Sequence, residues 1–117
     1  MAPSLLIVDD HPGFRSLARE LLEADGLQVV GEAADGASAL AAALALRPAV
    51  VLLDIHLPGE DGFAVAERLA ALPSPPVVVL ISSRPARDVR GRMATTTAAG
   101  FIHKGDLSAS TIAAVVG

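Results

Sequence analysis

The stretch that decides the fold is VVLLDIHLPGEDG, residues 50–62. Its first four residues are all apolar, which is typical of a strand buried on both faces in a parallel sheet covered by helices. The run reaches Asp54 and is then broken by Pro58 and Gly59. A buried carboxylate is costly to desolvate, and the carboxyl ends of such strands are where open α/β sheets bind ligands. We therefore expect Asp54 to be the centre of a functional site.

Apolar runs of strand length alternate with segments of helical spacing on both sides of this stretch. Strands are expected over residues 5–8, 27–34, 49–53, 77–81 and 101–103. Helices are expected over residues 14–25, 37–46, 63–72, 88–99 and 111–116. The alternation requires parallel strands with right-handed crossovers. The predicted fold class is α/β, a flavodoxin-like doubly wound five-stranded parallel sheet of order 2-1-3-4-5.

The fourth and fifth helices are expected to be weak or short. Gly91 and the three threonines at residues 95–97 are poor helix formers. The last helix is brief and could be capped by Ser108 or Ser110. No G-x-G-x-x-G turn follows the first strand, which argues against a dinucleotide-binding fold.

Composition indicates one domain over residues 1–117 that needs no covalent staples. The chain has no cysteine, so disulfides and thiolate metal sites are excluded. A net charge of −4 argues against a general nucleic-acid surface. The apolar region 40–57 is interrupted by Arg47 and Pro48, and the amino terminus lacks the charged start of a signal peptide. We therefore expect a cytoplasmic protein with no membrane partner.

Polar side chains stand at the carboxyl ends of four predicted strands. Asp9 and Asp10 follow the first strand, Asp54 the third, Ser82 the fourth and Lys104 the fifth. The first and third strands are neighbours in the predicted order, so three carboxylates should converge. Their mutual repulsion favours a bound cation. Oxygen ligands without cysteine favour Mg²⁺, which keeps room for a phosphate oxygen.

Lys104 is the single lysine, since the other eight basic residues are arginine. A lone compact ammonium at a strand end suggests a geometric need for a point charge. It could pair with Asp54 at rest and with a phosphoryl oxygen after transfer. The Ser82 hydroxyl could hydrogen-bond the same phosphoryl group.

Four segments, LIVDDHPGFR, DIHLPGEDG, VVVLISS and GFIHK, carry a family resemblance that covers the whole chain. In this order and spacing, the sequence resembles the receiver domains of two-component response regulators, which share the fold of the chemotaxis regulator. The resemblance implies that Asp54 is the phosphoacceptor and that a histidine kinase is the partner. It implies the following further roles: Asp10 as a direct Mg²⁺ ligand, Asp9 as a ligand through water, the His56 backbone carbonyl as a ligand, Lys104 and Ser82 as holders of the phosphoryl oxygens, and Phe101 as the aromatic switch.

The DDHP and VVGEAADG segments look most like the branch that usually carries a helix-turn-helix output domain. This resemblance implies control of transcription. Shifts of Ser82 and Phe101 would alter the face of the fourth helix, fifth strand and fifth helix, and we expect a homodimer to use that face. DNA contact is expected only through an output domain outside these 117 residues. Gly105 stands where many members of the family have proline, so the resemblance implies a cis peptide after Lys104 less strongly. Ser83 stands where alanine is usual, which is a small change.

Two other functions remain open at this point. A phosphatase of the haloacid-dehalogenase type also uses an aspartate nucleophile, but it needs a second aspartate where this chain has His56. An interaction module that needs no phosphorylation is the third possibility, and the set of Asp9, Asp10, Asp54, Ser82 and Lys104 argues against it. The first interpretation describes a switch that catalyses only its own phosphorylation and dephosphorylation, not an enzyme with a free substrate.

Several residues have ordinary structural explanations beside the functional ones. Ser82 could be a helix cap and Phe101 a plain core residue. The three histidines could suggest a transition-metal site, but we expect each to be a loop residue that is solvated or whose position is determined by the backbone. They are His11, His56 and His103. Four arginines near the fourth helix are either a partner-binding face or a solvated one; they are Arg84, Arg87, Arg90 and Arg92.

Overall fold

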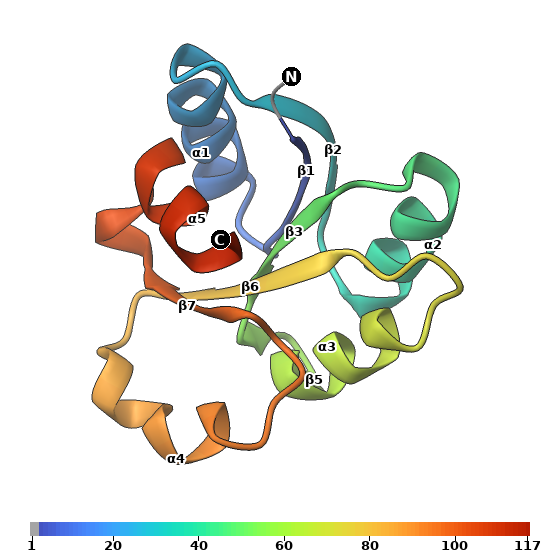
Figure 1. Cartoon of the computed structure of the whole chain (residues 1–117), viewed down its shortest axis with the longest axis vertical. Helices are drawn as coiled ribbons and strands as arrows, with labels where there is room; N and C mark the ends of the chain where they lie inside the picture. The colour runs from blue at the N-terminus through green and yellow to red at the C-terminus, as the bar shows by residue number, and fades with distance from the viewer. Residues whose placement is uncertain (1–2) are drawn as a thin grey trace.

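A computed structural model describes residues 3–117 and has at its centre a five-stranded parallel sheet (Figure 1). The sheet contains, in chain order, β1 (Ser4–Val8), β2 (Gln28–Ala33), β3 (Val50–Asp54), β6 (Val77–Ser82) and β7 (Gly100–His103). Their spatial order is β2-β1-β3-β6-β7, which is the predicted order 2-1-3-4-5 of a flavodoxin-like sheet. Met1 and Ala2 lie outside the described residues. The predictions of a single domain over residues 1–117 and of an amino terminus without a signal peptide included these two residues.

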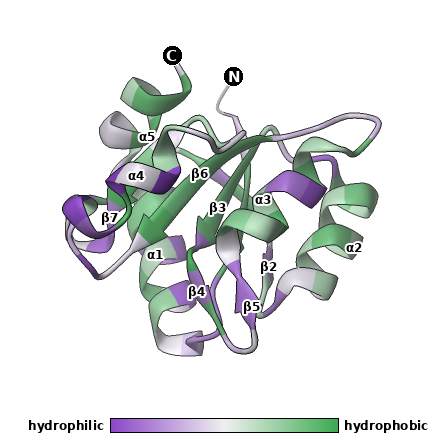
Figure 2. Ribbon diagram, turned by 90° about the horizontal axis from the view of Figure 1, so that it is seen from below, coloured by the Kyte–Doolittle hydropathy of each residue, from purple (hydrophilic) through white to green (hydrophobic). Residues whose placement is uncertain are grey.

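Helices cover both faces of the sheet, as the alternating sequence requires. The helices α1 (Pro12–Ala24) and α5 (Ala109–Val116) pack on one face, and α2 (Gly36–Leu46) and α3 (Gly62–Ala70) pack on the other (Figure 1). Alternate residues of β1 divide between the two cores, with Leu6 on the α2–α3 side and Ile7 on the α1–α5 side. Every residue of β3 is buried. Figure 2, coloured by hydropathy, shows β3 and β6 mostly green between the helices. Asp54 is thereby held at the end of the most enclosed strand.

Side-chain caps fix where three of the helices begin. Asp35 and Ser108 each form a capping box, at the starts of α2 and α5. Asp61 caps α3 by accepting a hydrogen bond from the backbone N–H of Phe63. Of the two serines considered for the last helix, Ser108 is therefore the cap. The helix begins at Ala109, two residues before its predicted start.

The segment after β6 forms very little helix, as predicted. It contains a 3-10 turn, η1 (Ala86–Asp88), and one turn of α-helix, α4 (Arg90–Met93). Neither turn contains a buried residue. The predicted helix over 88–99 is therefore wrong in length, because Gly91 and the threonines that follow α4 do not sustain it.

One element of the structure was not predicted from the sequence. The turn after β3 is a small antiparallel hairpin of β4 (His56–Leu57) and β5 (Glu60–Asp61).

Among the described residues there is no cis peptide bond, so the Lys104–Gly105 bond is trans. None of the helices in residues 3–117 combines the length and apolarity that crossing a bilayer requires.

Gly62 brings the start of α3 against the carboxyl end of β3. A Cβ atom at this position would lie 2.5 Å from the Cα of Ile55 and 2.6 Å from the carbonyl oxygen of Asp54. The backbone N–H of Gly62 donates to the carbonyl of Ile55 at 2.9 Å. Only glycine permits this approach without moving the backbone beside Asp54.

Candidate functional site

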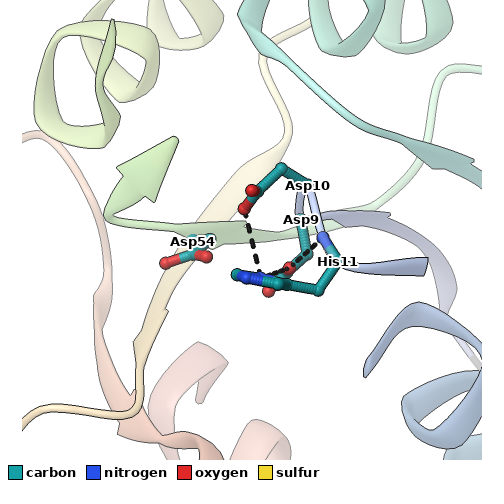
Figure 3. Close-up of side chains that lie close together, drawn as sticks. All are labelled: Asp9, Asp10, His11 and Asp54. Atoms are coloured by element: carbon teal, nitrogen blue, oxygen red, sulfur yellow. Dashed lines mark hydrogen bonds and ion pairs between the residues drawn. The ribbon is translucent and has the colours of Figure 1, made fainter. Parts of the chain in front are cut away.

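The carboxyl ends of β1 and β3 bring Asp9, Asp10 and Asp54 together at one edge of the sheet (Figure 3). One donor atom from each of these aspartates and one from His11 all lie within 4.8 Å of one another. Lys104 enters from the end of β7, next to β6 in the sheet. The predicted convergence of three carboxylates and the single lysine is therefore present in the structure.

Asp9 is fully buried and bonded at both carboxylate oxygens. Its Oδ1 accepts a hydrogen bond from the backbone N–H of His11 at 2.8 Å and lies 3.0 Å from the His11 ring. Its Oδ2 accepts a hydrogen bond from Lys104 Nζ at 2.5 Å. Burial alone would raise the pKa of Asp9, but the bonds from Lys104 and His11 outweigh it, so the pKa is lowered. Asp9 is thus held as a carboxylate.

Asp54 has a different environment although it lies beside Asp9. Its Oδ1 accepts a hydrogen bond from the backbone N–H of His56 at 2.9 Å, and its Oδ2 lies 3.3 Å from Lys104 Nζ. Burial raises the pKa of Asp54, with a further contribution from Asp9, and these effects exceed the opposing ones of His56 and Lys104. Lys104 and the His56 N–H therefore offset only part of the cost of burying the charge of Asp54.

Asp10 supplies the observation that best fits a cation. Its side chain is partly exposed, yet its Oδ1 is buried and has no hydrogen-bond partner among the described residues. The His11 ring nitrogen lies 3.2 Å from this oxygen but without hydrogen-bond geometry. A carboxylate oxygen left unpaired beside two other carboxylates is the ligand type that Mg²⁺ prefers. The residues present therefore fit a divalent cation.

Ser82 is fully buried at the end of β6. Its hydroxyl oxygen accepts a hydrogen bond from the backbone N–H of Arg84 at 3.0 Å. In this state the hydroxyl acts as a local turn cap, which was the structural alternative to the phosphoryl contact. A phosphoryl contact requires the hydroxyl to donate its hydrogen elsewhere, which this bond to Arg84 leaves possible.

Phe101 is paired with Leu80 across the sheet and is only partly buried. It packs against the core on the α2–α3 side and lines a groove of about 360 Å³ between β7, η1 and α5. Phe101 therefore has the core contact expected of a plain core residue and also the adjacent free space that an aromatic switch requires.

Of the three histidines, His11 lies closer to the site than a solvated loop residue would. Its side chain is 68% exposed, but its ring contacts Asp9 and Asp10. The sequence placed His11 directly after the two aspartates, and that spacing was the available signal. The His103 ring lies elsewhere, bonded to the backbone of Ser83 and Gly105. His56 is exposed and offers its backbone to the site.

The arginines after β6 differ in their contacts. Arg92 forms an ion pair with Asp61 and stacks over the Phe63 ring at 4.2 Å, so it ties α4 to the start of α3. The remaining three are exposed, as a solvated face would be; they are Arg84, Arg87 and Arg90.

Comparison with known proteins gives one consistent result. The family model of the response regulator receiver domain matches residues 5–116. BvgA of Bordetella pertussis, named as a transcription regulator of virulence factors, is 38% identical over 104 residues, which are 89% of this chain and 50% of BvgA. The chain thus spans about half the length of that relative.

Two further matches come from a solved receiver-domain structure and from a protein with a different name. The signal receiver domain of NarL from Mycobacterium tuberculosis, named as a response regulator, superposes with a TM-score of 0.85 at 34% identity, covering 99% of this chain and 98% of that one. A protein-glutamate methylesterase/protein-glutamine glutaminase of Anaeromyxobacter dehalogenans is 48% identical over 86 residues, 73% of this chain and 25% of that protein.

Proposed function

This chain belongs to the family of response regulator receiver domains, and we propose from this that Asp54 accepts a phosphoryl group from a histidine kinase. The single observation that supports Asp54 most strongly is its position at the end of β3 with one oxygen 3.3 Å from the only lysine. Asp9 is already bonded at both oxygens, whereas Asp54 has its second oxygen only loosely paired. Asp54 is therefore the better placed nucleophile.

The transfer forms one bond and breaks another at phosphorus. A carboxylate oxygen of Asp54 attacks the phosphorus of the phosphohistidine, and the departing imidazole nitrogen keeps the electron pair of the broken N–P bond. The hydrogen bond from the His56 N–H holds the carboxylate in orientation. Lys104 turns towards the phosphoryl oxygens, where its charge stabilises the product.

Asp10, Asp9, Asp54 and the His56 carbonyl would together hold Mg²⁺ in this proposal. The cation supplies positive charge that offsets the charge developing on the phosphoryl oxygens. The Asp10 oxygen that has no hydrogen-bond partner among the described residues supports this role for the cation.

We also infer how the signal leaves the site. Ser82 would move towards the phosphoryl group and donate its hydroxyl hydrogen to it, and Phe101 would turn into the space released between β6 and β7. The surface of α4, β7 and α5 would then change and serve for homodimer formation. The matched residues cover only half of BvgA. We therefore include in the proposal a separate output region that binds DNA and controls transcription in the cytoplasm.

Intact-protein mass after incubation with a small phosphodonor tests the function directly. One phosphoryl group per chain should appear with Mg²⁺ and disappear with EDTA or in Asp54→Ala. Modification of Asp54→Ala at the rate of the unaltered protein would contradict the assignment. A phosphatase of the dehalogenase type would instead release phosphate repeatedly from a free substrate, and the exposed His56 offers no carboxyl acid for that step.

A further inference from the structure

The His11 ring lies within the carboxylate cluster at the end of β1. Its Nδ1 is 3.0 Å from Asp9 Oδ1 and 3.2 Å from Asp10 Oδ1. Together with Asp54, these residues place three oxygen donors and one nitrogen donor within 4.8 Å of one another (Figure 3). The cluster thus differs from an all-oxygen site by one imidazole nitrogen.

The ring can leave its contact with Asp9 without leaving that carboxylate unpaired. Asp9 Oδ1 also accepts the backbone N–H of His11, and Oδ2 keeps its bond to Lys104. The His11 side chain is 68% exposed, so little packing opposes a turn of the ring. The buried Asp10 Oδ1 has no hydrogen-bond partner among the described residues and lies beside the same ring.

We propose, resting on the function proposed above, that His11 is a nitrogen ligand of the cation site and shifts its preference towards first-row transition ions such as Zn²⁺. Mg²⁺ binds oxygen and keeps several waters, so it gains little from an imidazole. Zn²⁺ takes histidine nitrogen and aspartate oxygen together in four-coordinate sites. The nitrogen that now faces Asp9 and Asp10 would bind the ion, with the ring hydrogen on Nε2.

Calorimetric titration with ZnCl₂ and with MgCl₂, at one fixed pH, tests the specificity. His11→Ala should weaken Zn²⁺ binding about tenfold or more, in line with the loss of a ligand, and change Mg²⁺ binding less than about threefold. His103→Asn is the matched control, because that ring contacts Ser83 and Gly105 rather than the cluster. Thermal unfolding followed by circular dichroism establishes that each variant is folded.

Nitrogen-15 NMR of the histidine rings identifies the ligand atom. Zn²⁺ should shift the Nδ1 resonance of His11, and the shift should persist in His103→Asn. Unchanged Zn²⁺ affinity in His11→Ala, or a shift confined to the His56 and His103 rings, would overturn the proposal. Phosphorylation of the unaltered protein with Mg²⁺ keeps the two hypotheses apart. If it succeeds while His11→Ala binds Zn²⁺ normally, only the role of His11 is wrong; if it fails, the phosphoacceptor function is wrong.

Discussion

Lys104 and Asp9, 95 positions apart in the sequence, are joined by a hydrogen-bonded ion pair of 2.5 Å, whereas Lys104 lies 3.3 Å from Asp54. Lys104 is therefore bound more closely to Asp9 than to Asp54, the proposed phosphoacceptor. Its Nζ also lies 4.3 Å from the centre of the Phe14 ring. Any group that forms at Asp54 must compete with these contacts for the same ammonium.

Lys104→Arg should impair the switch far more than an ordinary exchange of like charges. The planar guanidinium is longer and cannot replace a compact ammonium that approaches both Asp9 and Asp54. We expect binding of trifluoroberyllate, a phosphoryl mimic, to weaken about tenfold or more, the size of one lost charged hydrogen bond. Fluorine-19 NMR measures this directly. Arg84→Lys, a like-charge exchange at an exposed site, should bind normally, and equal binding by both variants would count against a direct Lys104 contact.

Gly62→Ala should destabilise the fold by about 1–3 kcal/mol, the usual range for an overpacked site. The new Cβ would meet the backbone of Ile55 and Asp54, neither of which can move alone. Gly91→Ala is the control, since a Cβ there meets nothing within 4 Å and alanine favours helix by about 1 kcal/mol. Urea unfolding followed by circular dichroism suits a chain without tryptophan or tyrosine. A Gly62→Ala protein as stable as the original would disprove the close approach.

The ion pair of Asp61 and Arg92 should lose its stabilising effect in acid. The hydrogen bond from Arg92 lowers the pKa of Asp61 below its ordinary value of 3.8. A lowered folded-state pKa gives stability that is present above pH 3.8 and lost as pH falls through the folded value. Because both side chains are about half exposed, a double-mutant cycle with Asp61→Asn and Arg92→Gln should give only about 0.5 kcal/mol at pH 7. Coupling that stays constant to pH 2 would contradict this.

Amide exchange should change most between residues 82 and 104 when trifluoroberyllate binds. The turn of α4 contains no buried residue. The arrangements of α4 with and without a phosphoryl group at Asp54 should therefore differ little in free energy. A preference of about 3 kcal/mol changes their ratio roughly a hundredfold. Hydrogen exchange measured by mass spectrometry should show little change in α1 and α2. Changes limited to the loops at Asp10 and Asp54 would mean that no signal leaves the site.

The sheet order and the meeting of the three aspartates with Lys104 were predictable from the sequence. The apolar run Val50–Asp54 and its counterparts determine parallel strands, and parallel strands place their carboxyl ends at one edge. Local patterns also indicated that the segment around Gly91 would form little helix.

Contacts decided by side-chain packing were not predictable in the same way. The β4–β5 hairpin depends on a two-residue pairing of His56 with Asp61 and Leu57 with Glu60, which has no periodic signal. The preference of Lys104 for Asp9 over Asp54 depends on differences of less than 1 Å. The place of the His11 ring depends on a rotamer, which spacing alone does not determine.

Because Lys104 is the only lysine and its side chain is 15% exposed between two carboxylates, the chain contains a built-in chemical reporter. Among its side chains, an amine-selective acylating reagent can modify only this one, and it reacts only when the amine is released from its ion pairs and unprotonated. The rate of acylation at Lys104, read by peptide mass, therefore follows the occupancy of the site without any added dye. A lysine-specific protease would likewise cut the unfolded chain at one place, so a single fragment pair would report how often the fold opens.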